Sequence, residues 1–258
     1  MFSRKRHPAN LPRIPAGRRV YAIGDIHGES RLLHELLLKI DDDASHRGDA
    51  DTVLLFIGDF IDRGCGAVSL LRIFSEMTDS RIVILKGNHE AALVDVYRGD
   101  EEALAFWLRC GGHATLSGLG VPSIDPTLEP AQTLRSLRYA LSERVINWLD
   151  SLPHSWSIGD YFFAHAGVRP GVSFKRQDQD DLLWIREPFL SSRRWHGKVV
   201  VHGHTIEPGL PVLGGNRIGI DTGAHEHGCL TALGLEEDMQ WLLQVEDGRA
   251  RRVHAPLG

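Results

Sequence analysis

The segment VLLFIGDFIDRG, residues 53–64, joins a run of large apolar residues directly to a glycine and a cluster of charged side chains. The apolar run Val53 to Ile57 has the length and the β-branched composition of a buried strand. Gly58 permits a sharp turn at the end of that strand, so that Asp59 and Arg63 can be presented together. The segment therefore predicts a strand that ends in a cluster of functional side chains.

The same pattern, a short apolar run followed by a small residue and then polar residues, occurs elsewhere in the chain. The other runs span residues 20–23, 82–85, 161–164, 199–201 and 218–220. Continuous apolar runs of this kind are typical of strands that are covered on both faces. Apolar stripes with helical spacing lie between several of them, as in residues 32–40 and 68–74. This alternation predicts an α/β fold with substantial parallel pairing.

The length and the distribution of charge suggest one domain with a short extension. The chain has 258 residues, which suits a single large domain. Residues 91–150 are mostly helical in pattern and predict a helical cap beside the sheet. Residues 1–19 hold six basic residues and no acidic residue. We therefore expect a flexible basic arm over residues 1–18 and one domain over residues 19–258.

Composition excludes several broad classes of protein. The chain has 29 basic and 34 acidic residues, a formal net charge of −5, which argues against a nucleic-acid binder. It has no apolar run of about 18 residues, so no membrane span is expected. Its three cysteines include no CxxC pair, which fits a reducing compartment. We expect a cytoplasmic protein with no membrane partner.

Four further polar clusters follow predicted strands in the same way. They read Gly24-Asp25-Ile26-His27-Gly28, Gly87-Asn88-His89-Glu90, His165-Ala166-Gly167 and His202-Gly203-His204-Thr205. The carboxyl ends of strands in an α/β sheet are where ligands gather. Mixed carboxylate, amide and imidazole side chains suit ions such as Mn²⁺, Fe²⁺ or Zn²⁺. The clusters therefore predict a metal centre, which could hold two ions if the two oxygens of Asp59 bridge them.

The remaining charged residues in these clusters suit phosphate chemistry. Arg63 can make forked contacts to phosphate oxygens. His89 can protonate a departing oxygen, and Asp62 can orient its imidazole. A pair of cations beside these groups predicts hydrolysis of a phosphate ester.

These motifs resemble those of the phosphoprotein phosphatase family of calcineurin-like metallophosphoesterases. The family patterns GDxHG, GDxVDRG, GNHE, HAG and HGHT stand here as GDIHG, GDFIDRG, GNHE, HAG and HGHT, with Ile61 in place of the common valine. The match extends from about Val20 to Leu233. It implies a central mixed β-sandwich flanked by helices, with two divalent metal ions at the strand ends. Mn²⁺ is the expected ion, with Fe or Zn as alternatives.

The resemblance also implies roles for individual residues. The metal ligands would be Asp25 and His27 for the first ion, Asp59 as the bridge, and Asn88, His165 and His204 for the second. The general acid would be His89, with Asp62 as its carboxylate partner. Phosphate would be held by Arg63, Asn88 and Arg186. His202 is expected to support the site through hydrogen bonds, and residues 220–224 to act as scaffold.

The same family contains enzymes with different substrates. Position 206 is isoleucine, where many metallophosphodiesterases carry a further metal-binding histidine, and this favours a monoesterase. Residues 107–116 resemble the WLxxGGxxTL segment of bacterial protein phosphatases, and residues 183–189 favour the same branch. We therefore expect a serine/threonine protein phosphatase, in which a metal-bridging hydroxide attacks phosphorus, acting on a phosphorylated protein or a small phosphoester.

Two alternatives remain at this point. The first is a symmetrical diadenosine tetraphosphate hydrolase. The second is a non-catalytic scaffold, which the retention of all six ligand positions and of His89 disfavours.

Overall fold

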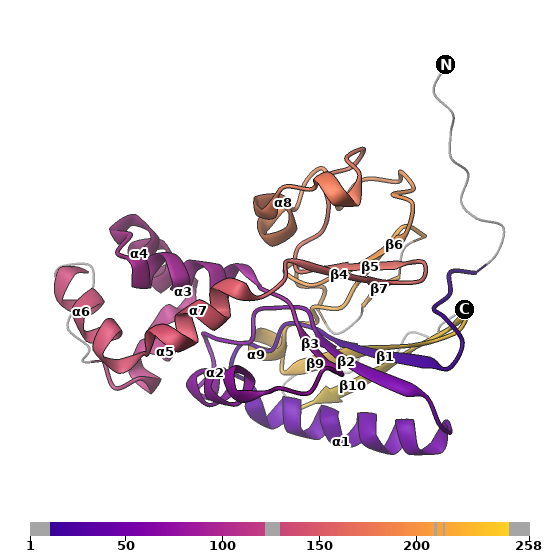
Figure 1. The fold of residues 1–258 in the computed structure, drawn as a ribbon, viewed down its shortest axis with the longest axis horizontal. Helices are drawn as coiled ribbons and strands as arrows, with labels where there is room; N and C mark the ends of the chain where they lie inside the picture. The colour runs from indigo at the N-terminus through magenta and orange to yellow at the C-terminus, as the bar shows by residue number, and fades with distance from the viewer. Residues whose placement is uncertain (1–10, 122–129, 209–210, 214, 248–258) are drawn as a thin grey trace.

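The chain forms two five-stranded β-sheets, as seen in a computed structural model that describes residues 11–121, 130–208, 211–213 and 215–247 (Figure 1). The first sheet has the order β10-β9-β1-β2-β3. Its strands are β1 (Arg18–Ile23), β2 (Asp51–Phe56), β3 (Ile82–Ile84), β9 (Cys229–Glu236) and β10 (Met239–Glu246). Strands β1, β2 and β3 run parallel, whereas β9 pairs antiparallel with both β1 and β10.

The second sheet has the order β4-β5-β6-β8-β7 and is mixed as well. Its strands are β4 (Ser155–Ile158), β5 (Tyr161–Ala164), β6 (Val199–His202), β7 (Val212–Leu213) and β8 (Arg217–Gly219). Strands β5, β6 and β8 are parallel, and the two edge pairs are antiparallel. All six predicted strands are present.

The two sheets pack face to face through one apolar core. Val20 and Leu55 of the first sheet share this core with Phe163 and Val201 of the second. The other face of the first sheet packs against helices, and Leu36 of α1 lies there. These contacts confirm the expected mixed β-sandwich flanked by helices.

Helices fill the segment between β3 and β4, which confirms the expected helical cap. The helices of the cap are α3 (Asn88–Arg98), α4 (Glu101–Trp107), a short π-helix (Leu108–Gly112), α5 (His113–Gly118), α6 (Pro130–Ala140) and α7 (Glu143–Ser151). The remaining helices are α1 (Ser30–His46), α2 (Ala67–Glu76), a 3₁₀ turn (Phe174–Arg176), α8 (Gln179–Trp184) and α9 (Ala224–His227). Figure 1 shows α4, α5 and α6 projecting to one side of the sheets.

The prediction of a flexible arm over residues 1–18 is wrong for its last part. Ile14 is buried in the core between the sheets, and its backbone N–H donates to the Glu237 carbonyl at 2.8 Å. The backbone N–H of Arg13 donates to the Asp160 carboxylate at 3.0 Å. Burial of the apolar Ile14 side chain explains why this segment is held. Residues 1–10 lie outside the described residues.

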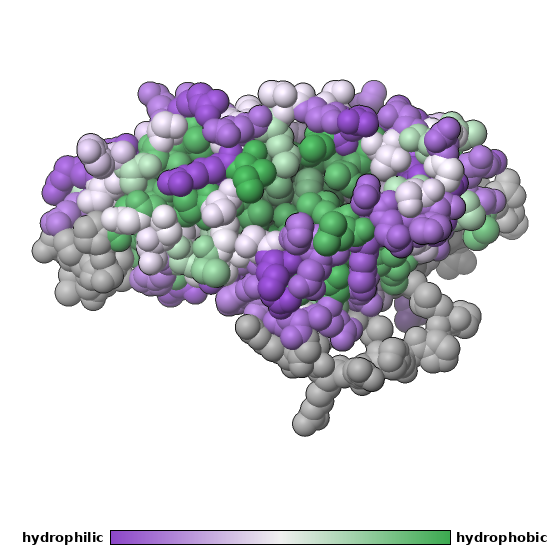
Figure 2. Space-filling model, turned by 90° about the horizontal axis from the view of Figure 1, so that it is seen from below, coloured by the Kyte–Doolittle hydropathy of each residue, from purple (hydrophilic) through white to green (hydrophobic). Residues whose placement is uncertain are grey.

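The outer surface of α1 and α2 carries exposed apolar side chains. Figure 2 shows this side of the molecule, where apolar residues gather in the middle of the face and polar residues surround them. Leu38 and Ile73 are among the exposed large apolar residues.

Among the described residues, no helix combines the length and the apolar character that crossing a bilayer requires.

Candidate active site

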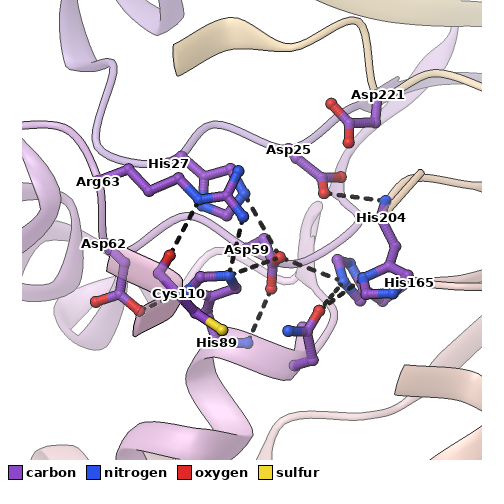
Figure 3. Close-up of polar contacts among 12 residues, drawn as sticks. Asp25, His27, Asp59, Asp62, Arg63, His89, Cys110, His165, His204 and Asp221 are labelled. Atoms are coloured by element: carbon purple, nitrogen blue, oxygen red, sulfur yellow. Dashed lines mark hydrogen bonds and ion pairs between the residues drawn. The ribbon is translucent and has the colours of Figure 1, made fainter. Parts of the chain in front are cut away.

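The side chains of the polar clusters lie together in one site (Figure 3). Several of these residues have a positive backbone φ angle. Of the described residues other than glycine, six have positive φ, and only Glu237 of these lies away from the clusters. The other five are His27, Asp59, Asp62, Arg63 and His204, with φ between 46° and 68°. Such backbone costs of the order of 1–3 kcal/mol per residue and is found mainly at functional sites.

Asp59 lies at the centre of the site. Its Oδ2 atom is 3.6 Å from His27 Nε2, 3.8 Å from His89 Nε2 and 3.4 Å from His165 Nε2. Two compact groups of candidate metal ligands share this carboxylate, one with His27 and His89 and the other with His165 and His204. A carboxylate placed between two such groups can bridge two cations.

Asn88 joins the second group. Its Oδ1 atom lies 2.8 Å from His165 Nε2 and 2.8 Å from His204 Nδ1. The structure therefore brings together the three predicted ligands of the second ion and Asp59.

Two of the imidazoles are oriented for metal binding by backbone carbonyls. His27 Nδ1 lies 3.1 Å from the Ile61 carbonyl, and His165 Nδ1 lies 3.0 Å from the Ile57 carbonyl. Donation from Nδ1 leaves the lone pair of Nε2 facing the site, which is the usual arrangement of metal-binding histidines. Burial lowers the pKa of His27 well below its usual value, which favours the neutral form that binds metals.

Asp25 provides the test of whether a cation fits here. One oxygen, Oδ2, accepts the backbone N–H of His204 at 3.0 Å, while the buried Oδ1 has no hydrogen-bond partner among the described residues. Burial, with the nearby charges of Asp221 and Asp59, raises the pKa of Asp25 well above its usual range. A buried, partly unpaired carboxylate fits a cation, although Asp25 lies outside both compact groups.

His89 is paired with Asp62 in a buried dyad. His89 Nδ1 donates to Asp62 Oδ2 at 2.7 Å. Burial opposes the charged imidazole, but the carboxylates of Asp59 and Asp62 outweigh it and raise the pKa of His89 to about 9. The Nε2 atom of His89 lies on the cavity side, 3.4 Å from an Arg63 nitrogen. This geometry suits a general acid.

The cap holds the carboxylate of this dyad in place. Trp107 Nε1 donates to Asp62 Oδ2 at 2.6 Å, and the Thr115 hydroxyl donates to Asp62 Oδ1 at 2.5 Å. Gly112 is needed between them, because a Cβ there would lie 2.4 Å from the Trp107 ring. Trp107 and Thr115 belong to the WLxxGGxxTL segment, but their contact with Asp62 is not evident from the sequence.

Glu90 is a second positioning residue that the sequence does not reveal. Its side chain is fully buried. The carboxylate accepts backbone N–H groups from Asp59 (2.8 Å), Phe60 (3.0 Å), Ile61 (3.3 Å) and Gly87 (2.9 Å). Glu90 thereby ties the loop after β2 to the loop after β3.

The site opens into a cavity of about 960 Å³. Arg63 and the predicted phosphate-binding residue Arg186 both line it, together with the exposed aromatic rings of Phe106 and Trp184. The Arg63 backbone N–H donates to the Gly111 carbonyl at 3.1 Å, which holds this residue against the cap.

The sequence also predicts that His202 and Asp221 support the site. His202 lies outside both ligand groups; its Nδ1 is 3.0 Å from the Gly203 carbonyl, and burial lowers its pKa to about 3. Asp221, expected to act as scaffold, has a side chain that lines the cavity.

Comparison with known proteins identifies the class. A model of the calcineurin-like phosphoesterase family matches residues 18–229. The chain therefore belongs to the calcineurin-like phosphoesterase family, whose members are metal-dependent hydrolases. This confirms the resemblance found in the sequence.

Individual relatives span most of the chain. A symmetrical bis(5'-nucleosyl)-tetraphosphatase from Nitrosospira multiformis is 27% identical, over 90% of this chain and 98% of its own length. Serine/threonine-protein phosphatase 2 from Escherichia coli is 33% identical, over 83% of this chain and 91% of its own length. A metallophosphoesterase structure from Sphaerobacter thermophilus covers 90% of this chain and 89% of its own, with a TM-score of 0.52 and 16% identity. Alignments with three further symmetrical tetraphosphatases span only 44–59% of those relatives.

Proposed function

We propose that this chain removes phosphate from phosphoserine and phosphothreonine in proteins. The observation that carries this proposal is the buried His89–Asp62 dyad, in which His89 lines the cavity. A serine or threonine alkoxide is a poor leaving group and needs a proton from such an acid.

Six side chains of this chain would hold two cations. Asp25, His27 and Asp59 would hold one cation, and Asp59, Asn88, His165 and His204 would hold another. Mn²⁺ is the cation that we propose, because it accepts carboxylate, amide and imidazole ligands. When bound, such a pair of cations lowers the pKa of water and offsets the negative charge of the phosphoryl group.

The remaining residues act on the substrate. Arg63 and Arg186 hold the phosphoryl oxygens that do not react, with Asn88 beside them. His89 then gives its Nε2 proton to the leaving oxygen, and Asp62 stabilises the ring through Nδ1. Trp107 and Thr115 keep the Asp62 carboxylate in the orientation that this transfer requires.

Symmetrical hydrolysis of a dinucleoside tetraphosphate is the second candidate, and the curated relatives favour it. More of the relatives given above have this activity than have protein phosphatase activity, and the one from Nitrosospira multiformis aligns over nearly its whole length. The cavity has room for a nucleotide, and Phe106 and Trp184 offer aromatic faces on which a base could stack.

The two candidates differ in the leaving group. A nucleoside diphosphate departs with far less help from an acid than an alkoxide does. We would therefore measure kcat/KM on phosphoserine and phosphothreonine peptides and on diadenosine tetraphosphate, with Mn²⁺ present. The proposal expects the peptides to be preferred; a clear preference for the dinucleotide would favour the second candidate.

The variant His89→Asn sharpens this experiment. We expect kcat on the phosphoserine peptide to fall by roughly 10²–10⁴-fold, with a much smaller fall on p-nitrophenyl phosphate, whose leaving group is a weak base. His113→Asn, which changes an exposed histidine of the cap, is the matched control. Equal losses on both substrates would contradict the acid role of His89.

A further inference from the structure

Asp221 lies in the loop after β8, next to the candidate metal centre. Its side chain is 3% exposed and lines the cavity. One oxygen, Oδ1, accepts the backbone N–H of Gly223 at 3.0 Å. Figure 3 shows the Asp221 carboxylate beside that of Asp25, on the side of Asp59 away from His89.

The neighbouring carboxylates of Asp25 and Asp221 destabilise each other in the metal-free protein. Asp25 is 2% exposed and Asp221 is 3% exposed, so water solvates neither carboxylate. The buried Asp25 Oδ1 atom also lacks a hydrogen-bond partner among the described residues. Two buried carboxylates and an unpaired oxygen are a costly arrangement unless a cation binds there.

The predicted ligands are divided unequally between the two ions. The second would have Asp59, Asn88, His165 and His204, whereas the first would have only Asp25, His27 and the shared Asp59. Residue 206, two positions after His204, is isoleucine and cannot add an imidazole.

We propose that Asp221 belongs to the first cation site, where its carboxylate holds a water molecule bound to the ion. The Gly223 N–H occupies Asp221 Oδ1, which leaves the other carboxylate oxygen to accept a hydrogen bond from such a water. Carboxylates of this kind orient the bound groups of a metal and strengthen its binding. This inference rests on the metal centre of the family and is independent of which phosphoester is hydrolysed.

The test compares Asp221→Asn with the wild-type protein by calorimetric titration of the metal-free chain with Mn²⁺. Asparagine keeps the Oδ1 acceptor for Gly223 and removes only the charge. We expect one of two binding events to weaken by roughly 10–100-fold. Asp180→Asn, which removes the charge of an exposed carboxylate lining the same cavity, should leave both events unchanged.

Thermal unfolding distinguishes a role of Asp221 in metal binding from a purely structural role. Without metal, Asp221→Asn should unfold at the same temperature as wild type or higher, because the repulsion with Asp25 is relieved. With Mn²⁺, its gain in Tm should be smaller than that of wild type.

Two results would overturn the proposal. One is wild-type affinity at both Mn²⁺ sites in Asp221→Asn. The other is a loss of stability that is equal with and without Mn²⁺, which would make Asp221 a scaffold residue. Should Asp221→Asn not fold, Asp221→Ser gives the same comparison with a shorter neutral side chain, and wild-type affinity there would equally overturn it.

Discussion

The loops of the two sheets contribute different kinds of residue to the same site. Those after β1, β2 and β3 supply the carboxylates of Asp25 and Asp59, the dyad, Arg63 and four of the five strained backbone positions. Those after β5 and β6 supply two imidazoles, and the segment between these strands places Trp184 and Arg186 on the cavity wall.

The two groups of loops also differ in how firmly they are held. Four backbone N–H groups of the first group converge on the buried Glu90. Two side chains of the cap hold Asp62. Arg186, in contrast, is exposed. We infer that the first sheet's loops perform the chemistry and that the wall from the second sheet mainly binds substrate.

The largest effect is expected from Asp59→Asn. Losing the charge shared by both ligand groups should lower kcat/KM by roughly 10³-fold or more, because several kcal/mol of charge stabilisation depends on the cations. Metal analysis should show fewer than two Mn²⁺ per chain, with Asp180→Asn as the control. Two bound ions together with a wild-type rate would show that Asp59 is not the bridge.

Glu90→Gln should have the next largest effect, on stability. An amide cannot accept all four N–H groups, so buried donors are left unpaired and the free energy of unfolding should fall by about 3 kcal/mol. Urea denaturation measures this change. Glu35→Gln, on the exposed face of α1, should cost well under about 1 kcal/mol. Similar losses in the two variants would contradict the role given to Glu90.

Thr115→Val tests the link between the cap and the dyad. The replacement keeps the shape of the side chain but removes the hydroxyl that donates to Asp62. We expect kcat on a phosphoserine peptide to fall by about tenfold, roughly 1.4 kcal/mol, while metal content stays the same. An unchanged kcat would mean that the cap does not position the dyad.

Arg186→Ala should have the smallest effect and a different signature. Removing one cation from the exposed wall should raise KM for small phosphoesters by several-fold, up to about tenfold, with little change in kcat. Steady-state kinetics separate the two parameters. A fall in kcat at constant KM would erase the distinction between the two groups of loops.

Much of the fold can be predicted because each parallel strand is a short, continuous apolar run. Strands β9 and β10 are not predicted, although β9 pairs directly with β1. The flexible arm is predicted wrongly because the burial of Ile14 depends on a contact with Glu237, 223 residues away.

The candidate site, like the fold, has parts that the sequence predicts and parts that it does not. The predicted ligands and the dyad lie in local motifs at strand ends, where adjacent residues already suggest the chemistry. The contacts of Trp107 and Thr115 with Asp62 span 45 and 53 residues, so no local pattern reveals them. The proximity of Asp221 to Asp25 likewise depends on how the two sheets pack.

The central claim is that side chains from both sheets hold two cations across Asp59. Anomalous diffraction from a crystal soaked in Mn²⁺ tests it most directly. We predict two peaks about 3.5–4 Å apart on either side of the Asp59 carboxylate, one near His27 and the other near Asn88 and His165. A single peak, or peaks that Asp59 does not touch, would contradict this account.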